Sequence, residues 1–311
     1  MSGKEVNLNN RQSSRRNILY RVSQLVGFLL GARVFVVALL TFALYVSTFF
    51  LFNREESFRT FVFDFRVHGI IFCAILSILA GGIINQFYDR EKDKILKPFS
   101  TRLQSFLKQK YFLYFYLGLN LVSLTVAALL SPRVLIFFLV YQFLMWFYSH
   151  KLSRILILNN LTFVSLTLYP FFGMLVYYQT FSVKIFFMAV FLFLIILIID
   201  VLKDMLTKNA DKVFGYLTIP NFFGSRTAKY ISVILCILLF LVSMLIVFAS
   251  GLQNVMMYYF AVGMFIIALC ISLIIRNSKK TVFYALNVLR LWVFVGILCM
   301  LADGILSHFL R

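Results

Sequence analysis

The sequence predicts an all-α fold, a polytopic membrane bundle of nine transmembrane helices around a central cavity, with the N-terminus in the cytoplasm. Three observations carry this prediction: the composition, the length of the apolar stretches and the distribution of charge. Of the 311 residues, 62% are hydrophobic and 13% are charged, whereas a soluble domain is about half apolar and a quarter charged. With a mean hydropathy of +0.94, the chain lacks the polar residues needed to cover a soluble core. Water-soluble enzymes, disordered chains and secreted disulfide scaffolds are therefore excluded.

Nine apolar stretches are long enough to cross a bilayer, whose core of about 30 Å needs roughly 20 residues of helix. The fourth stretch is the shortest. The expected spans are Val26–Phe52, Val67–Ile84, Tyr111–Leu130, Val134–Phe147, Ile157–Tyr178, Val183–Ile199, Tyr230–Ala249, Met256–Ile275 and Val282–Leu306.

The charge of the connecting segments predicts the orientation. With the N-terminus inside, the inner segments carry 22 Lys and Arg and the outer segments carry 6. Such an asymmetry is the positive-inside pattern of membrane proteins. Residues 1–22 then form a basic cytoplasmic tail, and residues 23–311 form a single domain of nine transmembrane helices.

The excess of basic residues also bears on partners. The chain has 30 Lys and Arg against 11 Asp and Glu, a formal net charge of +19. In a membrane protein, cytoplasmic loops and anionic lipid headgroups explain such an excess. Dense interleaving of basic and aromatic residues, typical of a nucleic-acid groove, is not found in any one loop. We therefore expect membrane lipids as partners and no nucleic acid.

The acidic residues are scarce and clustered. In the first cluster, Asn85, Asp89 and Asp93 follow one another at intervals of four residues, so a continuing helix places all three on one face. Carboxylates stacked in this way repel unless a positive charge lies between them. Mg²⁺ usually takes one or two carboxylates together with substrate phosphates. The alternative is a solvated helix end, in which the interleaved lysines and arginine pair with the acids.

The second cluster follows the sixth span. Asp200 and Asp204 share a face, and Asp211 returns to nearly the same face if the helix continues. A carboxylate cluster at the end of an apolar span is costly unless it faces a cavity or an ion. The alternative is a polar loop that only sets the topology.

Taken together, the two clusters favour one kind of site. Both fall on the predicted cytoplasmic side, and both have basic neighbours. Binding of a diphosphate through bridging Mg²⁺ requires this combination, because the metal neutralises the phosphates while Lys and Arg stabilise the developing charge. An apolar bundle beneath such a site would hold a long hydrocarbon tail.

The first cluster resembles the first Asp-rich motif of the UbiA superfamily of intramembrane prenyltransferases, N-[D/Q]-x-x-D-x-x-x-D followed by N-K-P. In the stretch NQFYDREKDKILKP, Leu96 replaces the usual Asn before Lys-Pro. Two further motifs agree in order and predicted side. The matching residues are Asn85, Gln86, Asp89, Asp93, Lys97 and Pro98 in the first motif, Tyr148–Leu152 and Asn160 in a Tyr-Ser-x-x-Leu-Lys loop, and Asp211, Gly215, Thr218, Pro220 and Gly224 in the tail of the second motif.

One departure from the family pattern concerns the second motif. The family usually has an Asp four residues before the position of Asp211, and here that residue is Thr207. Asp204 is expected to substitute for this missing ligand. A weakened second metal site and a member without activity both stay open as alternatives.

The resemblance implies a transferase of prenyl groups: Mg²⁺-dependent transfer from a prenyl diphosphate to a lipophilic or aromatic acceptor within the membrane, in which residues 23–311 form the prenyltransferase-like domain. The implied catalytic residues are Asp89, Asp93, Asp204 and Asp211. The implied metal ligands are these four together with Asn85. The substrate-binding candidates are Arg90, Lys97, Tyr148, Lys151, Asn160 and Lys208.

Two questions stay open at this point. The alternative function is a non-catalytic transporter or lipid-binding membrane protein that uses the acidic segments for ions. Neither the acceptor nor the prenyl chain length follows from the sequence. We expect a multi-pass integral protein of a bacterial cytoplasmic membrane, with its active site on the cytoplasmic side.

Overall fold

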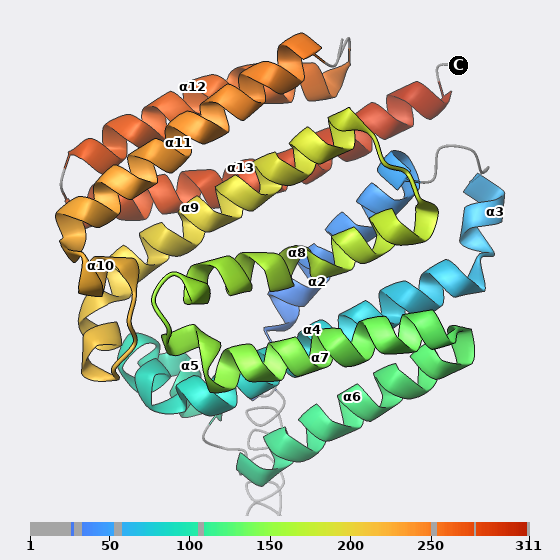
Figure 1. Cartoon of the computed structure of the whole chain (residues 1–311), viewed down its shortest axis with the longest axis horizontal. Coiled ribbons are helices and arrows are strands. Elements are labelled where there is room, and N and C mark those ends of the chain that lie inside the picture. The colour runs from blue at the N-terminus through green and yellow to red at the C-terminus, as the bar shows by residue number, and fades with distance from the viewer. Residues whose placement is uncertain are drawn as a thin grey trace, which may run out of the picture. The chain divides into compact units, whose positions relative to one another are not determined.

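The computed structural model describes residues 26–27, 33–52, 58–104, 109–249, 254–276 and 278–309. Throughout these residues the regular secondary structure is helical (Figure 1). Nine of the helices described there are long and apolar enough to cross a membrane, which confirms the predicted fold class. The predicted basic tail, residues 1–22, lies outside the described residues, and the orientation of the N-terminus stays a prediction.

The spans agree closely with those predicted. Their bounds are Val34–Ser47 (α2) continuing as a π-helix over Thr48–Phe52 (η1), Phe65–Leu96 (α4), Gln109–Leu130 (α6), Pro132–His150 (α7), Leu158–Tyr178 (α8), Val183–Val213 (α9), Gly224–Ala249 (α11), Val255–Ile275 (α12) and Lys279–Phe309 (α13). The shorter helices are Phe58–Val62 (α3), Pro98–Gln104 (α5), Leu152–Arg154 (η2) and Ile219–Phe222 (α10).

The two Asp-bearing segments are helical rather than looped. The predicted ends of the second and sixth spans, Ile84 and Ile199, were wrong, because α4 runs on to Leu96 and α9 to Val213. Neither extension contains a proline. α4 stops just before Lys97-Pro98, since proline disfavours helix in the residue before it. α9 stops before Gly215, whose φ of 71° is a left-handed conformation that glycine adopts without strain.

The chain divides into two compact units, one built on Phe72–Ser149 and the other on Leu40–Ile71 with His150–Arg311. In the first unit, α4 packs against α6 and α7 through small and polar side chains. The Ser77 and Ser123 hydroxyls lie 3.2 Å apart, and Gln142 Nε2 donates to Ser77 Oγ at 3.1 Å. A Cβ added to Gly81 would overlap the terminal methyl of Met145, so the Met145 side chain of α7 packs directly onto this glycine of α4.

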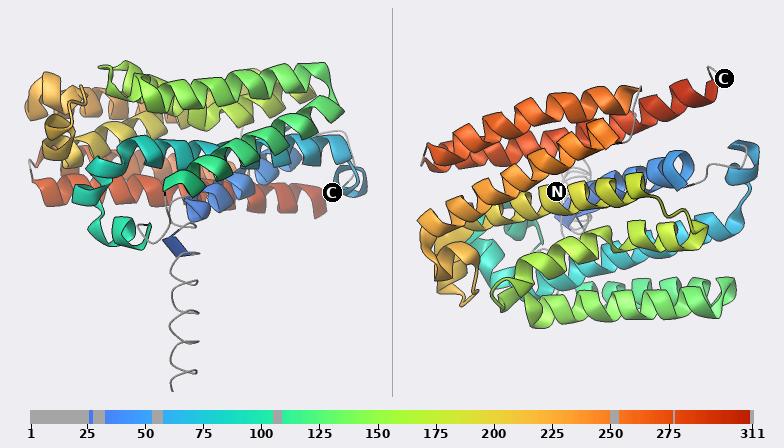
Figure 2. Two further views of the ribbon diagram at one scale, coloured as in Figure 1. Left: turned by 90° about the horizontal axis from the view of Figure 1, so that it is seen from below. Right: turned by 45° about the horizontal axis from the view of Figure 1, so that its top comes forward.

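In the second unit, four helices pack in a ring. α11 packs against α9 and α12, and α13 packs against α12 and α9 (Figures 1 and 2). Leu202, Leu239, Ile267 and Leu289 are fully buried within these helices. α8 and α10 pack against α9. α9 ends on the side of the ring where α11 and α13 begin.

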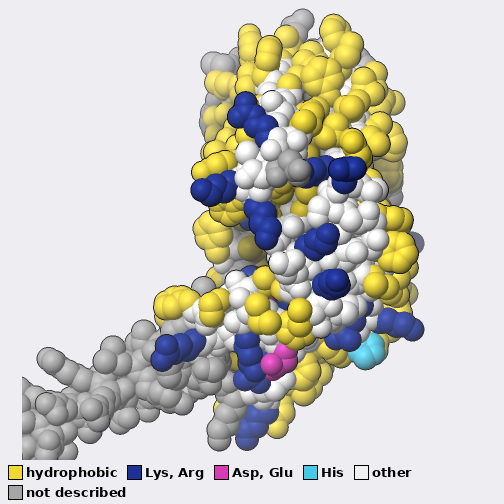
Figure 3. All heavy atoms as spheres, turned by 90° about the vertical axis from the view of Figure 1, so that its left-hand side faces the viewer, with side chains coloured by type: hydrophobic (Ala, Val, Ile, Leu, Met, Phe, Trp, Pro, Cys, Tyr) yellow, Lys and Arg dark blue, Asp and Glu magenta, His cyan; other side chains and the backbone are white. Residues whose placement is uncertain are grey.

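The surface has the character expected in a bilayer. Large apolar side chains such as Leu129 and Phe265 are about four-fifths exposed, at 82% and 78%. Such exposure is costly in water and neutral in hydrocarbon. Lys and Arg side chains gather on the face shown in Figure 3, and hydrophobic side chains cover its flanks.

Candidate active site

Three carboxylates lie on one face of α9. Asp200, Asp204 and Asp211 are all buried, with at most 3% of each residue exposed. Because α9 is continuous through Val213, the spacings of four and seven residues place the three side chains on the same face. The sequence predicted this alignment on condition that the helix continued, and it does.

An asparagine from the preceding helix, α8, is hydrogen-bonded to two of these carboxylates. Asn160, in the first turn of α8, donates from Nδ2 to Asp200 Oδ2 at 2.8 Å and to Asp204 Oδ2 at 2.9 Å. Asn159 Nδ2 approaches the same oxygen of Asp204 at 3.5 Å. The amide oxygen of Asn160 is buried and has no hydrogen-bond partner among the described residues. An oxygen in that state, beside two carboxylates, is suited to accept a cation.

A strained turn sets the beginning of α8. Ile157 has a φ of 66° and a ψ of −45°, and Leu158 N donates to Leu156 O at 2.7 Å across it. These values define a γ-turn of the rare, strained type. A β-branched residue with positive φ is a genuine outlier, and such strain clusters at functional sites. The turn directly precedes Asn159 and Asn160.

The segment before this turn is tied to the end of α9. Leu217 N donates to Arg154 O at 3.2 Å. The Arg154 guanidinium lies over the ring of Tyr216, 5.5 Å from its centroid, and Tyr216 is buried. These contacts connect the approach to α8 with the residues that follow Asp211.

Thr207 takes part in the same polar face. Its hydroxyl donates to Asp211 Oδ2 at 2.6 Å and approaches Lys203 O at 3.2 Å. The residue that departs from the family pattern therefore supports Asp211 with a neutral donor, where a carboxylate would add a further negative charge.

The charges of this set are unbalanced. Lys203 Nζ donates to Asp200 Oδ1 at 2.7 Å, and the same ammonium lies 5.1 Å from the ring centroid of Phe163. Asp204 has the carboxylates of Asp200 and Asp211 and the ammonium of Lys203 as its charged neighbours. Buried charges are expensive unless paired or bound to a metal. A hard divalent cation with oxygen ligands fits this donor set, and Mg²⁺ is such a cation.

The site does not form a three-carboxylate metal cage. Within the described residues, no three His, Cys, Asp or Glu side chains come close enough together to hold one ion. Asp211 follows Asp204 by seven residues, which is about 10 Å along a helix. Three carboxylates at one ion are not required, because an Mg²⁺ ion that also binds phosphates usually takes only one or two carboxylates from the protein.

The first cluster lies in the other unit, on the polar end of α4. Asn85 Nδ2 donates to Asp89 Oδ2 at 3.1 Å, and Lys97 Nζ lies 3.2 Å from Asp93 Oδ1. Lys94 pairs with Glu91 at 2.7 Å on the exposed side of the helix. The predicted stacking of Asn85, Asp89 and Asp93 on one helix is confirmed. The Glu91–Lys94 and Asp93–Lys97 pairs are of the kind that the solvated-end alternative expects, so that alternative stays open for α4.

The substrate-binding candidates differ in what their side chains contact. Asn160 is bound to two carboxylates and is therefore a positioning residue for them. Lys97 lies with Asp93, and Lys151 is exposed next to η2. Arg90 and Lys208 point to neutral partners: Arg90 Nη1 donates to Gln109 Oε1 at 2.9 Å and Lys208 Nζ to Ser225 Oγ at 3.0 Å. Tyr148, half-buried at the end of α7, belongs to the first unit.

Sequence reasoning placed Asp200 in the second cluster but left it out of the metal set, although Asn160 binds it as closely as Asp204. The position of Asp200 four residues before Asp204 was the available signal. Sequence reasoning did not include Asn159, and nothing in the sequence singled it out. Both asparagines lie in the first turn of α8 because this helix begins at Leu158.

Nine candidate membrane spans within the described residues, with carboxylate sets on the polar extensions of two of them, define a polytopic helical protein. The chain belongs to the UbiA prenyltransferase family, whose model matches residues 57–294. It is thus a membrane prenyltransferase, as the resemblance of the motifs implied.

Individual relatives are similar over most of the chain. A digeranylgeranylglyceryl phosphate synthase of Methanosphaera stadtmanae is 28% identical over 210 residues, which is 67% of this chain and 76% of the relative. A structure described as that of a digeranylgeranylglyceryl phosphate synthase in membranes has a TM-score of 0.70 at 18% identity, covering 91% of this chain and 99% of the other. The structure of a UbiA homologue from Archaeoglobus fulgidus bound to GPP and Mg²⁺ has a TM-score of 0.61 at 14% identity, covering 89% and 99%.

Proposed function

We propose that the chain transfers a prenyl group from a prenyl diphosphate to the hydroxyl of a glycerophosphate lipid, in a reaction that requires Mg²⁺. The observation that carries the proposal is the buried set of Asp200, Asp204 and Asp211 on α9, joined by Asn160 and accompanied by one lysine. A bound cation would stabilise these buried carboxylates. In a member of the UbiA prenyltransferase family, Mg²⁺ bound together with a prenyl diphosphate would be that cation.

The ligands proposed for Mg²⁺ come from both clusters. Asn85, Asp89 and Asp93 would supply the ligands of one ion, and Asp204 with the adjacent Asp200 and Asn160 those of another. Asp211, about 10 Å further along α9, would act on the bound diphosphate through Mg²⁺ or water rather than share an ion directly with Asp204. When bound, Mg²⁺ neutralises the diphosphate and makes it a better leaving group. The A. fulgidus homologue was solved with GPP and Mg²⁺, which supports this ligand pair for the present chain.

The residues of the chain have their own tasks in this proposal. Lys97 and Lys151 would stabilise the charge that develops on the departing diphosphate. Asn160 fixes the distance between the carboxylates of Asp200 and Asp204 through its two hydrogen bonds. Thr207 holds Asp211 in one orientation.

The proposed acceptor follows from the names of the relatives. A digeranylgeranylglyceryl phosphate carries two geranylgeranyl groups on a glyceryl phosphate, so a prenyltransferase would reach it by adding the second group. In that step the C1–O bond of the allylic diphosphate breaks and its electron pair leaves with the diphosphate. The glyceryl hydroxyl oxygen forms the new bond to C1, and its proton is released.

We also propose that the site faces the cytoplasm, because the helical extensions that carry both clusters hold many of the basic residues. The expectation of a bacterial membrane finds no support in the comparisons, since the relatives described above are archaeal.

The experiment is an assay of the purified full-length protein in lipid nanodiscs with geranylgeranyl diphosphate and geranylgeranylglyceryl phosphate. We expect release of diphosphate and formation of digeranylgeranylglyceryl phosphate with Mg²⁺, and neither in EDTA. An aromatic acid is tested in parallel as the competing acceptor. Product on the aromatic acid alone would overturn the acceptor, and no diphosphate release with any acceptor would favour the transporter alternative.

A further inference from the structure

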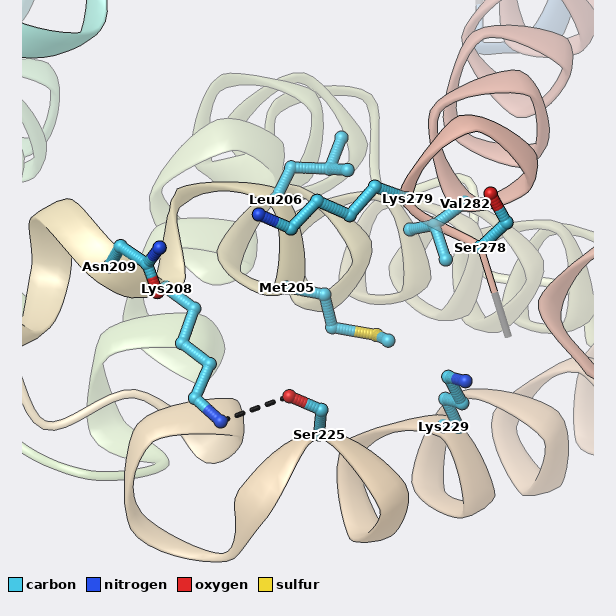
Figure 4. A pocket seen from close by; sticks show the side chains of 9 residues that line it. All are labelled: Met205, Leu206, Lys208, Asn209, Ser225, Lys229, Ser278, Lys279 and Val282. Carbon is cyan, nitrogen blue, oxygen red and sulfur yellow. Dashed lines mark hydrogen bonds between the residues drawn. The ribbon is translucent and has the colours of Figure 1, made fainter.

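A second polar site lies at the end of the four-helix ring, where α9 ends and α11 and α13 begin. It is a pocket of about 310 Å³, at the lower end of the range for small-molecule sites. The lining residues are Met205, Leu206, Lys208, Asn209, Ser225, Lys229, Ser278, Lys279 and Val282 (Figure 4). All of them belong to the second unit.

The charge of this pocket has one sign. Lys208 comes from α9, Lys229 from α11 and Lys279 from α13, and no Asp or Glu is among the lining residues. None of the three forms an ion pair within the described part of the chain. Three ammonium groups around one pocket repel one another, and an anion between them removes that cost.

Neutral donors complete the lining. Lys208 Nζ already donates to Ser225 Oγ (Figure 4), and Ser278 and Asn209 add a hydroxyl and an amide. Ser225 and Ser278 stand at the beginnings of α11 and α13, helix ends of positive potential. Ammonium groups, hydroxyls and amides are the donors that phosphate oxygens accept from.

The pocket is separate from the carboxylate face of α9. Each residue turns a helix by about 100°, so Met205 and Asn209 are turned about 100° and 140° from Asp204, whereas Lys208 is turned only about 40° from it. The Lys208 ammonium contacts Ser225 of α11, while the side chains of Asp200 and Asp204 contact Asn160 of α8. The other two lysines of the pocket, Lys229 and Lys279, come from α11 and α13, which carry none of these carboxylates.

We propose that this pocket binds a phosphate group, carried either by an anionic lipid headgroup or by free phosphate. Met205, Leu206 and Val282 give the pocket an apolar part, and basic pockets between transmembrane helices are known to bind lipid headgroups. Its volume accommodates a headgroup-sized anion but not a whole lipid.

The test uses the purified full-length protein in a zwitterionic detergent with EDTA present, so that phosphate bridged by Mg²⁺ to the carboxylates does not contribute. Calorimetric titrations compare dihexanoyl phosphatidic acid, inorganic phosphate and dihexanoyl phosphatidylcholine. The variant is Lys229→Gln with Lys279→Gln. The matched control is Lys280→Gln, which removes an adjacent positive charge that does not line the pocket.

We expect phosphatidic acid to bind, the double variant to bind it at least tenfold more weakly, and the control to bind it as the natural chain does. Equal affinity for inorganic phosphate, with the same loss in the variant, would identify free phosphate as the ligand; tighter binding of phosphatidic acid would identify the lipid. Unchanged affinity in the double variant, or no binding of either ligand to the natural chain, would overturn the proposal. Thermal unfolding of each variant verifies that it is folded.

Discussion

The carboxylates of α4 and those of α9 share a spacing but differ in surroundings. On α4, Asp89 is half-buried and Asp93 is paired with a lysine of its own helical end. On α9, Asp200 and Asp204 are buried and joined by an asparagine from another helix. On α4, Lys97 therefore neutralises Asp93, whereas on α9 Asp204 has two carboxylates and one ammonium as its charged neighbours. Spacing alone does not distinguish such sets; burial and the count of nearby cations do.

The largest effect should come from the carboxylates of α9. We expect Asp204→Asn to lower the rate of diphosphate release by about 1000-fold, because it removes a charge that holds Mg²⁺ at the leaving group. In EDTA its unfolding temperature should not fall, since repulsion within the set is reduced. The control is Asp303→Asn on α13. A variant with more than a tenth of the natural rate would remove Asp204 from the proposed metal site.

The next largest effect concerns the carboxylates of α4. Asp89→Ala should lower the same rate by about 100-fold, less than Asp204→Asn because water can partly replace a half-exposed ligand. The matched control is Glu91→Ala, two residues away, whose carboxylate pairs with Lys94 on the exposed side; its rate should be unchanged. Equal losses in the two variants would assign the α4 cluster to a solvated helix end.

Thr207 allows the α9 set to be tuned in both directions. Thr207→Val keeps the shape and removes the hydrogen bond to Asp211, so stability should fall by about 1 to 2 kcal/mol and the Mg²⁺ concentration for half the maximal rate should rise. Thr207→Asp adds a carboxylate and should lower that Mg²⁺ concentration. The measurement is rate against Mg²⁺ concentration. Activity that appears only in Thr207→Asp would mean that the natural second site is broken.

The smallest effect should come from the turn before α8. The γ-turn at Ile157 stores strain of about 1 to 3 kcal/mol, and Ile157 is 46% exposed, so Ile157→Gly loses little packing. After the entropy cost of glycine, we expect a net stabilisation of about 1 kcal/mol by thermal unfolding in detergent, with Ile157→Ala close to the natural chain. Destabilisation by the glycine would show that the turn carries no strain.

Much of the fold was predictable because each span is coded locally. Nine apolar stretches and their approximate bounds follow from composition along the chain, as does the shared face of Asn85, Asp89 and Asp93. The lengths of the polar extensions of α4 and α9 were not predicted, because hydropathy reports where a helix meets lipid and not where it ends. The true ends are set by Pro98 and by Gly215.

The site was predictable only in part, because its contacts join distant residues. Asp204 and Asp211 follow from spacing on one helix. The hydrogen bonds from Asn160 to Asp200 and Asp204 cross from α8 to α9, and no periodicity of either helix reports them. The hydrogen bond from Lys208 to Ser225 likewise crosses from α9 to α11, and the role of Lys208 in binding substrate stays a prediction.

In the function proposed above, the α4 and α9 carboxylates act on a single diphosphate through Mg²⁺. A double-mutant cycle of Asp89→Asn and Asp204→Asn tests it directly, with the dissociation constant of a non-reactive prenyl thiodiphosphate measured at saturating Mg²⁺. Residues that act on one ligand couple by about 0.5 to 3 kcal/mol, and independent sites add within about 0.5 kcal/mol. We predict a coupling of at least about 1 kcal/mol. Additive losses would show that the two sets of carboxylates do not bind the same diphosphate.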